Sequence, residues 1–304
     1  MDNIITSVLI LGNGFDLDLG LKTRYSDFAK SKEWDELYHI MKWSVSGLGH
    51  YLEKKSKEDN WFDIEESIAK YVKEKEQRND FQNVYEDKCY FEILKRKLAS
   101  YVDSFEVWET IKDNSLAAKI MEIDDTYKCF AKIYSFNYTN YEIATIYNEN
   151  IHPILKKEYV HNSGNNIVLG VGEQDCISTE YSFLKKVNQN IAPANLLVDL
   201  IDANEVIFFG HSINRYDMQY FRRYFDICSQ EYNRLPKRHI TFITKNEDSI
   251  IMIKDNLAYA ITSVTDFQMS CQVEFISTED YYGKTNEVDN CVHHLLNRLL
   301  NNTL

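Results

Sequence analysis

The stretch SVLILGNGFDLDLGLKTRYSDF, residues 7–28, decides the fold class. The apolar run Ile4–Leu11 is typical of a strand that is buried on both faces of a parallel sheet. Gly12 and Gly14 follow directly, which predicts a tight turn whose backbone N–H groups can face an anion. The dinucleotide fingerprint G-x-G-x-x-G needs a third glycine where the chain has Leu17, and no Walker lysine follows. The turn alone is therefore weak support for nucleotide binding.

Two acids, Asp16 and Asp18, follow the glycine turn. An ionised carboxylate repels a pyrophosphate, so we expect neither side chain to lie directly against one. A carboxylate is better suited to accept hydrogen bonds from ribose hydroxyls or from loop N–H groups. The structural alternative is that the acids cap the following helix. We expect sugar recognition or capping from the acids, with the glycine N–H groups left for phosphates.

Residues 31–128 show a different pattern from the first strand and turn. Charged and aromatic residues mix there at helical spacing, and Ile64 and Ile68 illustrate the apolar face of one such helix. We interpret 31–128 as a helical insertion. It packs on an α/β core formed by 1–30 and 129–304.

After residue 128, short apolar runs alternate with amphipathic segments. Expected strands are FAKIYSFN (130–137), NIVLGVG (166–172), VIFFG (206–210) and HITFITK (239–245). Expected helices are NYEIATIYNENI (140–151), LLVDLID (196–202), DMQYFRRYFDICSQ (217–230) and EVDNCVHHLLNRLL (287–300). Strands that alternate with helices imply right-handed crossovers and a parallel sheet. The predicted fold is therefore a Rossmann-like α/β core with a helical insertion after the first strand.

Polar clusters follow several of the expected strands, at Gly12–Asp18, Ser135–Asn140 and Gly210–Asp217. His161 in VHNSGN is a fourth candidate. Ligands of open α/β folds bind at the carboxyl ends of the strands. We therefore expect these remote segments to converge on one crevice.

Composition narrows the class of protein further. The net charge of -13 argues against binding of DNA or RNA through overall electrostatic attraction. No segment has the roughly 18 apolar residues of a membrane span, and the N-terminus lacks the basic region of a signal peptide. The six cysteines form no C-x-x-C pair, which favours reduced thiols in a cytoplasm and no metal site.

The chain resembles the AbiH family of bacteriophage abortive-infection proteins. The pieces that carry the resemblance are LILGNGFDLDLGLKTRYSDF (9–28), NWFDIEESIAKYV (60–72), SFNYTN (135–140), VHNSGN (160–165) and VIFFGHSINRYDMQYFRRYF (206–225). The resemblance implies a cytoplasmic protein that acts in phage defence.

AbiH-type proteins are in turn distantly similar to the sirtuin-like NAD-binding fold, which has ordered motifs G-A-G, T-Q-N-I-D, H-G and G-T-S. The counterparts here are Gly12-Asn13-Gly14, residues 135–139, His161-Asn162 and Gly210-His211-Ser212. The chain departs from the pattern at Thr139 and Asn162, and it lacks the four-cysteine zinc module. These departures argue against the function of a zinc-bearing deacylase. What remains is an NAD pocket that could transfer the ADP-ribose part of the cofactor to water.

The resemblance assigns roles to individual residues. Asn137 orients water and a ribose hydroxyl, because an amide has both donors and an acceptor. His161, expected to be partly exposed, accepts a proton from the 3′-hydroxyl or from water. The predicted cofactor-binding residues are Gly12, Asn13, Gly14, Phe15, Asp16, Gly210, His211 and Ser212. Asp63 or Glu66 could reach the pocket from the helical region, with stabilisation of a helix N-terminus as the alternative.

Two functions follow from this reading. The first is an NAD glycohydrolase that depletes the cofactor during infection and stays silent until a phage-derived trigger or partner protein acts; a homo-oligomer is compatible with it. The second is a non-catalytic nucleotide-binding sensor or scaffold, which Thr139 and Asn162 favour. A nuclease is opposed by the net acidity and by the lack of a metal-binding acid–histidine set.

Overall fold

The computed structural model describes residues 7–40, 47–58, 62–105, 111–112, 114–139, 157–161, 167–176, 178–189, 193–283 and 286–301. Six strands of these residues form one parallel sheet in the order β3-β2-β1-β4-β5-β6. The strands are β1 (Ser7–Leu11), β2 (Lys132–Ser135), β3 (Lys157–Tyr159), β4 (Glu205–Phe209), β5 (Arg238–Thr244) and β6 (Cys271–Ser277). The predicted α/β class is confirmed, and the strand order is that of dinucleotide-binding folds, with its switch point between β1 and β4.

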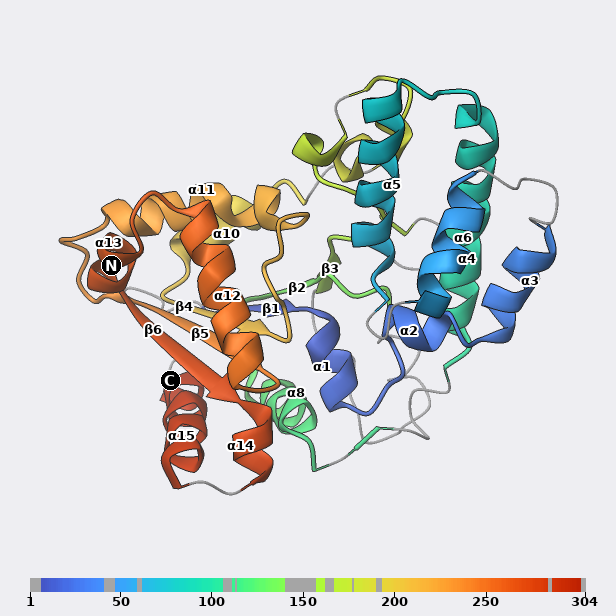
Figure 1. The fold of residues 1–304 in the computed structure, drawn as a ribbon. Helices are drawn as coiled ribbons and strands as arrows, with labels where there is room; N and C mark the ends of the chain where they lie inside the picture. Colours follow the sequence, from blue (N-terminus) through green and yellow to red (C-terminus); the bar gives the residue numbers. More distant parts are fainter. Residues whose placement is uncertain are drawn as a thin grey trace.

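Helices cover both faces of the sheet (Figure 1). One face packs against α10 (Leu196–Asp202), α11 (Met218–Gln230), α12 (Glu247–Ala260) and α13 (Val264–Ser270). The other packs against α1 (Asn13–Asp18), α8 (Leu116–Tyr127), α14 (Thr278–Tyr282) and α15 (Asn286–Asn301). Successive β1 residues alternate between the faces, so Val8 and Ile10 enter one core while Leu9 and Leu11 enter the other. This double burial explains why β1 reads as a continuous apolar run.

A separate helical layer faces the carboxyl ends of the strands (Figure 1). It contains α2 (Tyr25–Phe28), α3 (Lys32–Ile40), α4 (Leu48–Glu58), α5 (Ile64–Arg78) and α6 (Val84–Asp103). The predicted apolar face of α5 is confirmed, because Ile64, Ile68 and Val72 are fully buried in its core. No helix of the described residues is both long and apolar enough to cross a membrane.

The segments 167–176 and 178–189 pack against the helical layer and contain short 3-10 turns. These turns are η2 (Glu173–Asp175), η3 (Ser182–Leu184) and η4 (Lys186–Asn188). The strand predicted at 166–172 is wrong for its described part, where Val171 makes a single bridge with Lys185. Its apolar residues are buried among α5 and α6 instead of in the sheet. A short apolar run in the sequence predicts that the segment is buried. It does not tell whether the segment packs in the sheet or against the helical layer.

Other sequence-based expectations have different outcomes. Strands β4 and β5 and helices α10, α11 and α15 are confirmed within a few residues. Strands β3 and β6 and helices α12 and α13 were not predicted. The helix expected at 140–151 lies outside the described residues.

A buried carboxylate ties the helical layer together. Asp87 of α6 is 1% exposed and accepts hydrogen bonds from the Leu48 N–H at 2.7 Å and from the hydroxyls of Tyr71 at 2.7 Å and Tyr181 at 2.9 Å. These donors come from α4, α5 and the segment before η3. One side chain therefore joins four parts of the chain.

Replacing Asp87 with alanine should lower the free energy of unfolding by about 3 kcal/mol, because three buried donors lose their acceptor. Urea unfolding followed by circular dichroism measures this loss. The matched control is Glu92→Ala, an exposed acid on the same helix, which should change the free energy by less than about 0.5 kcal/mol. A loss of similar size in both variants would contradict the role of Asp87.

Candidate functional site

The loops that follow β1 and β4 are packed backbone against backbone. The Gly12 N–H donates to the Phe209 carbonyl and the Gly14 N–H to the Gly210 carbonyl, both at 2.9 Å. A Cβ atom on Gly12 would lie 2.5 Å from the His211 Cα, and one on Gly14 would lie 2.6 Å from the Gly210 Cα. The glycines of the first turn therefore permit this close approach. The expectation that their N–H groups are left for phosphates is wrong, because both already donate to the neighbouring loop.

Asp16 joins the first turn to the end of β2. Its carboxylate is 1% exposed and accepts hydrogen bonds from the Asn137 Nδ2 at 2.9 Å and the Thr139 Oγ1 at 2.6 Å. The Asn137 Nδ2 also donates to the Gly12 carbonyl at 3.0 Å. Asp16 therefore orients Asn137, and the N-cap position of α1 is occupied by Gly12 and not by Asp16.

Asp18 has a different role from Asp16. Its carboxylate accepts hydrogen bonds from the Ala117 N–H at 2.9 Å and the Tyr282 hydroxyl at 2.7 Å. It thus stabilises the first turn of α8, a helix remote in the sequence. One predicted role for the acids was to accept hydrogen bonds from N–H groups, and Asp18 has this role. It stabilises α8, however, and not the helix that directly follows the glycine turn.

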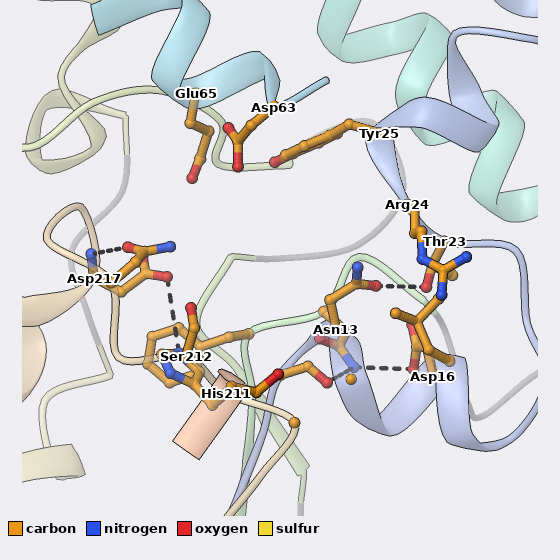
Figure 2. A pocket seen from close by; sticks show the side chains of 18 of the residues that line it. Asn13, Asp16, Thr23, Arg24, Tyr25, Asp63, Glu65, His211, Ser212 and Asp217 are labelled. Carbon is orange, nitrogen blue, oxygen red and sulfur yellow. Dashed lines mark hydrogen bonds and ion pairs between the residues drawn. The ribbon is translucent and has the colours of Figure 1, made fainter. Parts of the chain in front are cut away.

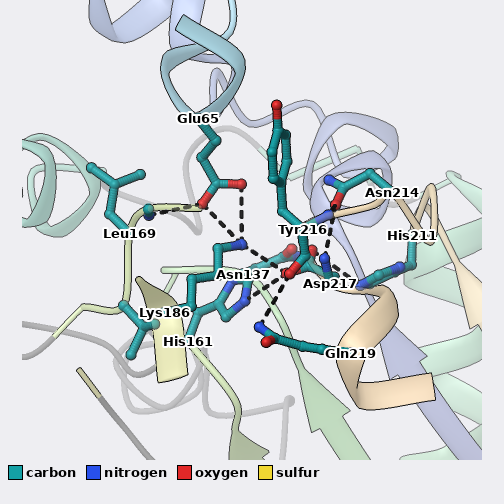
Figure 3. A network of polar contacts seen from close by, with 12 residues as sticks. Glu65, Asn137, His161, Leu169, Lys186, His211, Asn214, Tyr216, Asp217 and Gln219 are labelled. Atoms are coloured by element: carbon teal, nitrogen blue, oxygen red, sulfur yellow. Dashed lines mark hydrogen bonds and ion pairs between the residues drawn. The ribbon is translucent and has the colours of Figure 1, made fainter. Parts of the chain in front are cut away.

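The two histidines meet at one carboxylate, Asp217 (Figure 3). The His161 Nε2 lies 3.1 Å from the Asp217 Oδ1, and the His211 Nε2 lies 3.8 Å from the Asp217 Oδ2. The expected partial exposure of His161 is wrong, since the side chain is 4% exposed. It is covered by the rings of Phe136, at 5.2 Å between centroids, and Tyr138, at 5.9 Å.

Lys186 connects Asp217 to the helical layer. Its ammonium is fully buried, 2.7 Å from the Asp217 Oδ1 and 2.9 Å from the Glu65 Oε1. Glu65 stands in the first turn of α5 and also accepts from the Gly170 N–H at 3.3 Å. Asp217 occupies the N-cap position of α11 but its side chain caps nothing there. The carboxylate turns to Lys186 instead.

Burial and the Lys186 charge set the ionisation of this cluster. Burial and Lys186 lower the pKa of His161, and burial lowers the pKa of His211 to about 4. The His211 Nδ1 accepts from the Ile213 N–H at 2.9 Å, so the proton of the neutral ring is on Nε2, which faces Asp217. Burial raises the pKa of Asp217, but Lys186 and His161 outweigh it and keep the carboxyl ionised. Both imidazoles are neutral at neutral pH.

A pocket of about 1280 Å³ lies between the carboxyl ends of the strands and the helical layer (Figure 2). Nearly all of the predicted site residues line it, namely Gly12, Asn13, Gly14, Asp16, Asn137, Gly210, His161, His211 and Ser212. Phe15 does not, because its ring packs edge to face on Phe209 at 5.0 Å in the core. The pocket therefore collects segments from β1, β2, β3 and β4.

The helical layer supplies the opposite wall of the pocket through Asp63, Glu65 and Glu66 (Figure 2). Asp63 is also the N-cap of α5 and accepts from the Glu66 N–H at 2.9 Å. Asp63 therefore both lines the pocket and caps the N-terminus of α5. Arg24 also lines the pocket, close to the Asn13 turn, and it is exposed.

Sequence reasoning missed the centre of the polar network. Glu65 belongs to the same acid segment as Asp63 and Glu66, but only those two were expected to reach the pocket. Lys186 carried no signal, because its carboxylate partners are 121 and 31 residues away in the chain. Only the tertiary structure shows that this lysine is buried.

The sheet order and the polar pocket at its switch point define an α/β protein of the dinucleotide-binding architecture. The family model for "Bacteriophage abortive infection AbiH" matches residues 8–236. The chain therefore belongs to the AbiH family, which places it among proteins of phage abortive infection. No curated protein and no solved structure gives a significant match to the chain.

Proposed function

We propose that this abortive-infection protein binds NAD in the pocket and hydrolyses the bond between nicotinamide and ribose. The observation that carries the proposal is the position of the pocket at the β1–β4 switch point, where parallel sheets of this order bind dinucleotides. Its volume of about 1280 Å³ exceeds the range of roughly 300–1,000 Å³ that is usual for small-ligand sites. The order of the sirtuin-like motifs supports the choice of NAD.

To hydrolyse this bond, the protein has mainly to position the reacting groups and to stabilise the charge that develops. Cleavage builds positive charge on the ribose C1′, and nicotinamide leaves as a neutral molecule that needs no general acid. In the proposal, the Asn137 amide orients water and a ribose hydroxyl. The neutral His161 accepts a proton, and the imidazolium that forms lies beside the Asp217 carboxylate, 3.1 Å away.

Nicotinamide release from NAD by the purified chain tests the proposal. Chromatography should show nicotinamide and ADP-ribose in equal amounts, either directly or after addition of an extract from phage-infected cells that supplies a trigger or partner protein. No turnover under either condition would contradict hydrolysis.

A second candidate is a non-catalytic nucleotide sensor. It is favoured by one observation, which is that the Asn137 Nδ2 and the His161 Nε2 both face protein groups. For this function, NAD or ADP-ribose should raise the melting temperature without any product being formed.

Arg24 is the proposed partner of the ligand phosphates. No carboxylate of the described residues lies within ion-pair distance of its guanidinium, unlike Arg215, which pairs with Asp175 at 3.4 Å. Arg24→Ala should weaken ADP-ribose binding about tenfold, since a charge-assisted contact is lost. Isothermal titration calorimetry measures this change, with the exposed Arg222→Ala of α11 as a control. Equal affinities of both variants would argue against a phosphate at Arg24.

A further inference from the structure

The polar network beneath the pocket carries more negative than positive charge. The carboxylates of Glu65 and Asp217 share one ammonium, that of Lys186. The imidazoles of His161 and His211 are neutral because burial lowers the pKa of both. When Glu65 is ionised, these five groups carry a net charge of about −1. All of them are at most 5% exposed.

A surplus charge in a buried site is costly unless a counter-charge approaches it. The fold itself does not require it, since a buried ion pair is often no more stable than apolar residues of the same volume. The His211 Nε2 also lacks a hydrogen-bond partner among the described residues, since the nearest Asp217 oxygen is 3.8 Å away. An unsatisfied buried polar atom beside a large pocket points to a ligand that completes the site.

Building on the NAD site proposed above, we propose that this surplus binds the cationic nicotinamide–ribose end of the ligand, and that Glu65 is a catalytic residue. Figure 2 shows Glu65 and Asp63 extending from α5 toward the pocket, with His211 and Asp217 across from them and Arg24 on another side. The pyridinium end of the dinucleotide lies by Glu65 in this arrangement. The phosphates lie by Arg24.

The carboxylate acts on the charge that develops as the glycosidic bond breaks. The electron pair of the C1′–N bond leaves with nicotinamide, and the oxygen of water forms a new bond to C1′. Glu65 stabilises the positive ribose carbon between these events. One proton of the attacking water passes through the site to solvent. The balance is NAD⁺ and water giving nicotinamide, ADP-ribose and one proton.

The same arrangement makes cation binding depend on pH. Burial raises the pKa of the Glu65 carboxyl to about 7, although Lys186 acts against the shift. The other ionisable groups that face Glu65 are Asp217, Asp63, Tyr25, Tyr138 and Tyr220. Glu65 therefore loses its negative charge as the pH falls through about 7. The pocket should therefore bind a cation more tightly at pH 8 than at pH 6.

Paired calorimetric titrations with a non-hydrolysable carbocyclic NAD⁺ analogue and with NADH test the proposal. The two probes differ chiefly in the charge of the nicotinamide ring. Wild-type protein at pH 8 should prefer the cationic probe by at least about tenfold, from the attraction between opposite charges in a buried site. The preference should shrink at pH 6. Glu65→Gln keeps the shape of the side chain and should bring the preference within about twofold at either pH.

Two further variants complete the test. Glu74→Gln makes the same change at an exposed position of α5 and should behave as wild type. Glu65→Asp keeps the charge and should retain most of the preference, which covers the case that Glu65→Gln does not fold. Equal binding of both probes by wild-type protein would overturn this inference while leaving nicotinamide release to support the proposed function. Binding of neither probe would overturn both.

Discussion

Replacing Gly210 with alanine is expected to lower the free energy of unfolding by about 4 kcal/mol. Gly210 has a φ of +66°, a conformation that L side chains rarely adopt. A Cβ atom there would lie 2.2 Å from the Phe15 nitrogen and 2.4 Å from the Gly14 Cα. These are backbone atoms, so no side chain can rotate away to make room. The β1 and β4 loops must separate or the protein must unfold.

Urea unfolding measures the effect of Gly210→Ala, and Gly283→Ala provides the control. Gly283 has a φ of -69°, and a Cβ atom there would come no closer than 3.3 Å to another atom. The control should stay within about 1 kcal/mol of wild type. If Gly210→Ala is as stable as the control, the packing of the two loops described here is incorrect.

His161→Ala and Asn137→Ala are each expected to reduce nicotinamide release at least about 100-fold. Removal of the imidazole takes away the proposed proton acceptor beside Asp217. Removal of the amide takes away the group proposed to orient water and leaves Asp16 without one of its donors. Turnover measured at saturating NAD separates this loss from weaker binding.

Both variants need a check that the pocket survives. Calorimetric titration with ADP-ribose should still show binding, and thermal unfolding should show a folded protein. His293→Ala removes an exposed imidazole on α15 and should leave turnover unchanged. Activity that survives in both His161→Ala and Asn137→Ala would refute the roles assigned to these two residues.

The central sheet could be predicted because its strands are buried on both faces. β1 and β4 are entirely buried, so after the first residue of each strand the sequence is an apolar run that ends at a glycine. β6 escaped prediction because it is an edge strand whose middle residues, such as Glu274, are only partly buried. β3 lies at the other edge and has only three residues. Edge strands carry less of the periodic signal.

The candidate site could be predicted where topology alone decides it. Residues that directly follow parallel strands reach the same edge of the sheet, so Gly12, Asn137 and Gly210 were placed together correctly. The hydrogen bonds of Asp16 could not be foreseen, because they depend on where Asn137 and Thr139 lie after folding. Phe15 was predicted to bind the cofactor because it lies in the glycine turn. Its large apolar ring packs in the core instead.

Binding of an adenine dinucleotide at the β1–β4 switch point is tested most directly by a crystal structure of the protein with ADP-ribose. ADP-ribose is the stable product of the proposed reaction and contains both phosphates and both riboses. We predict density for the diphosphate near Arg24 and for the terminal ribose between Asn137 and Glu65. Density for ADP-ribose at any other place on the protein would contradict it.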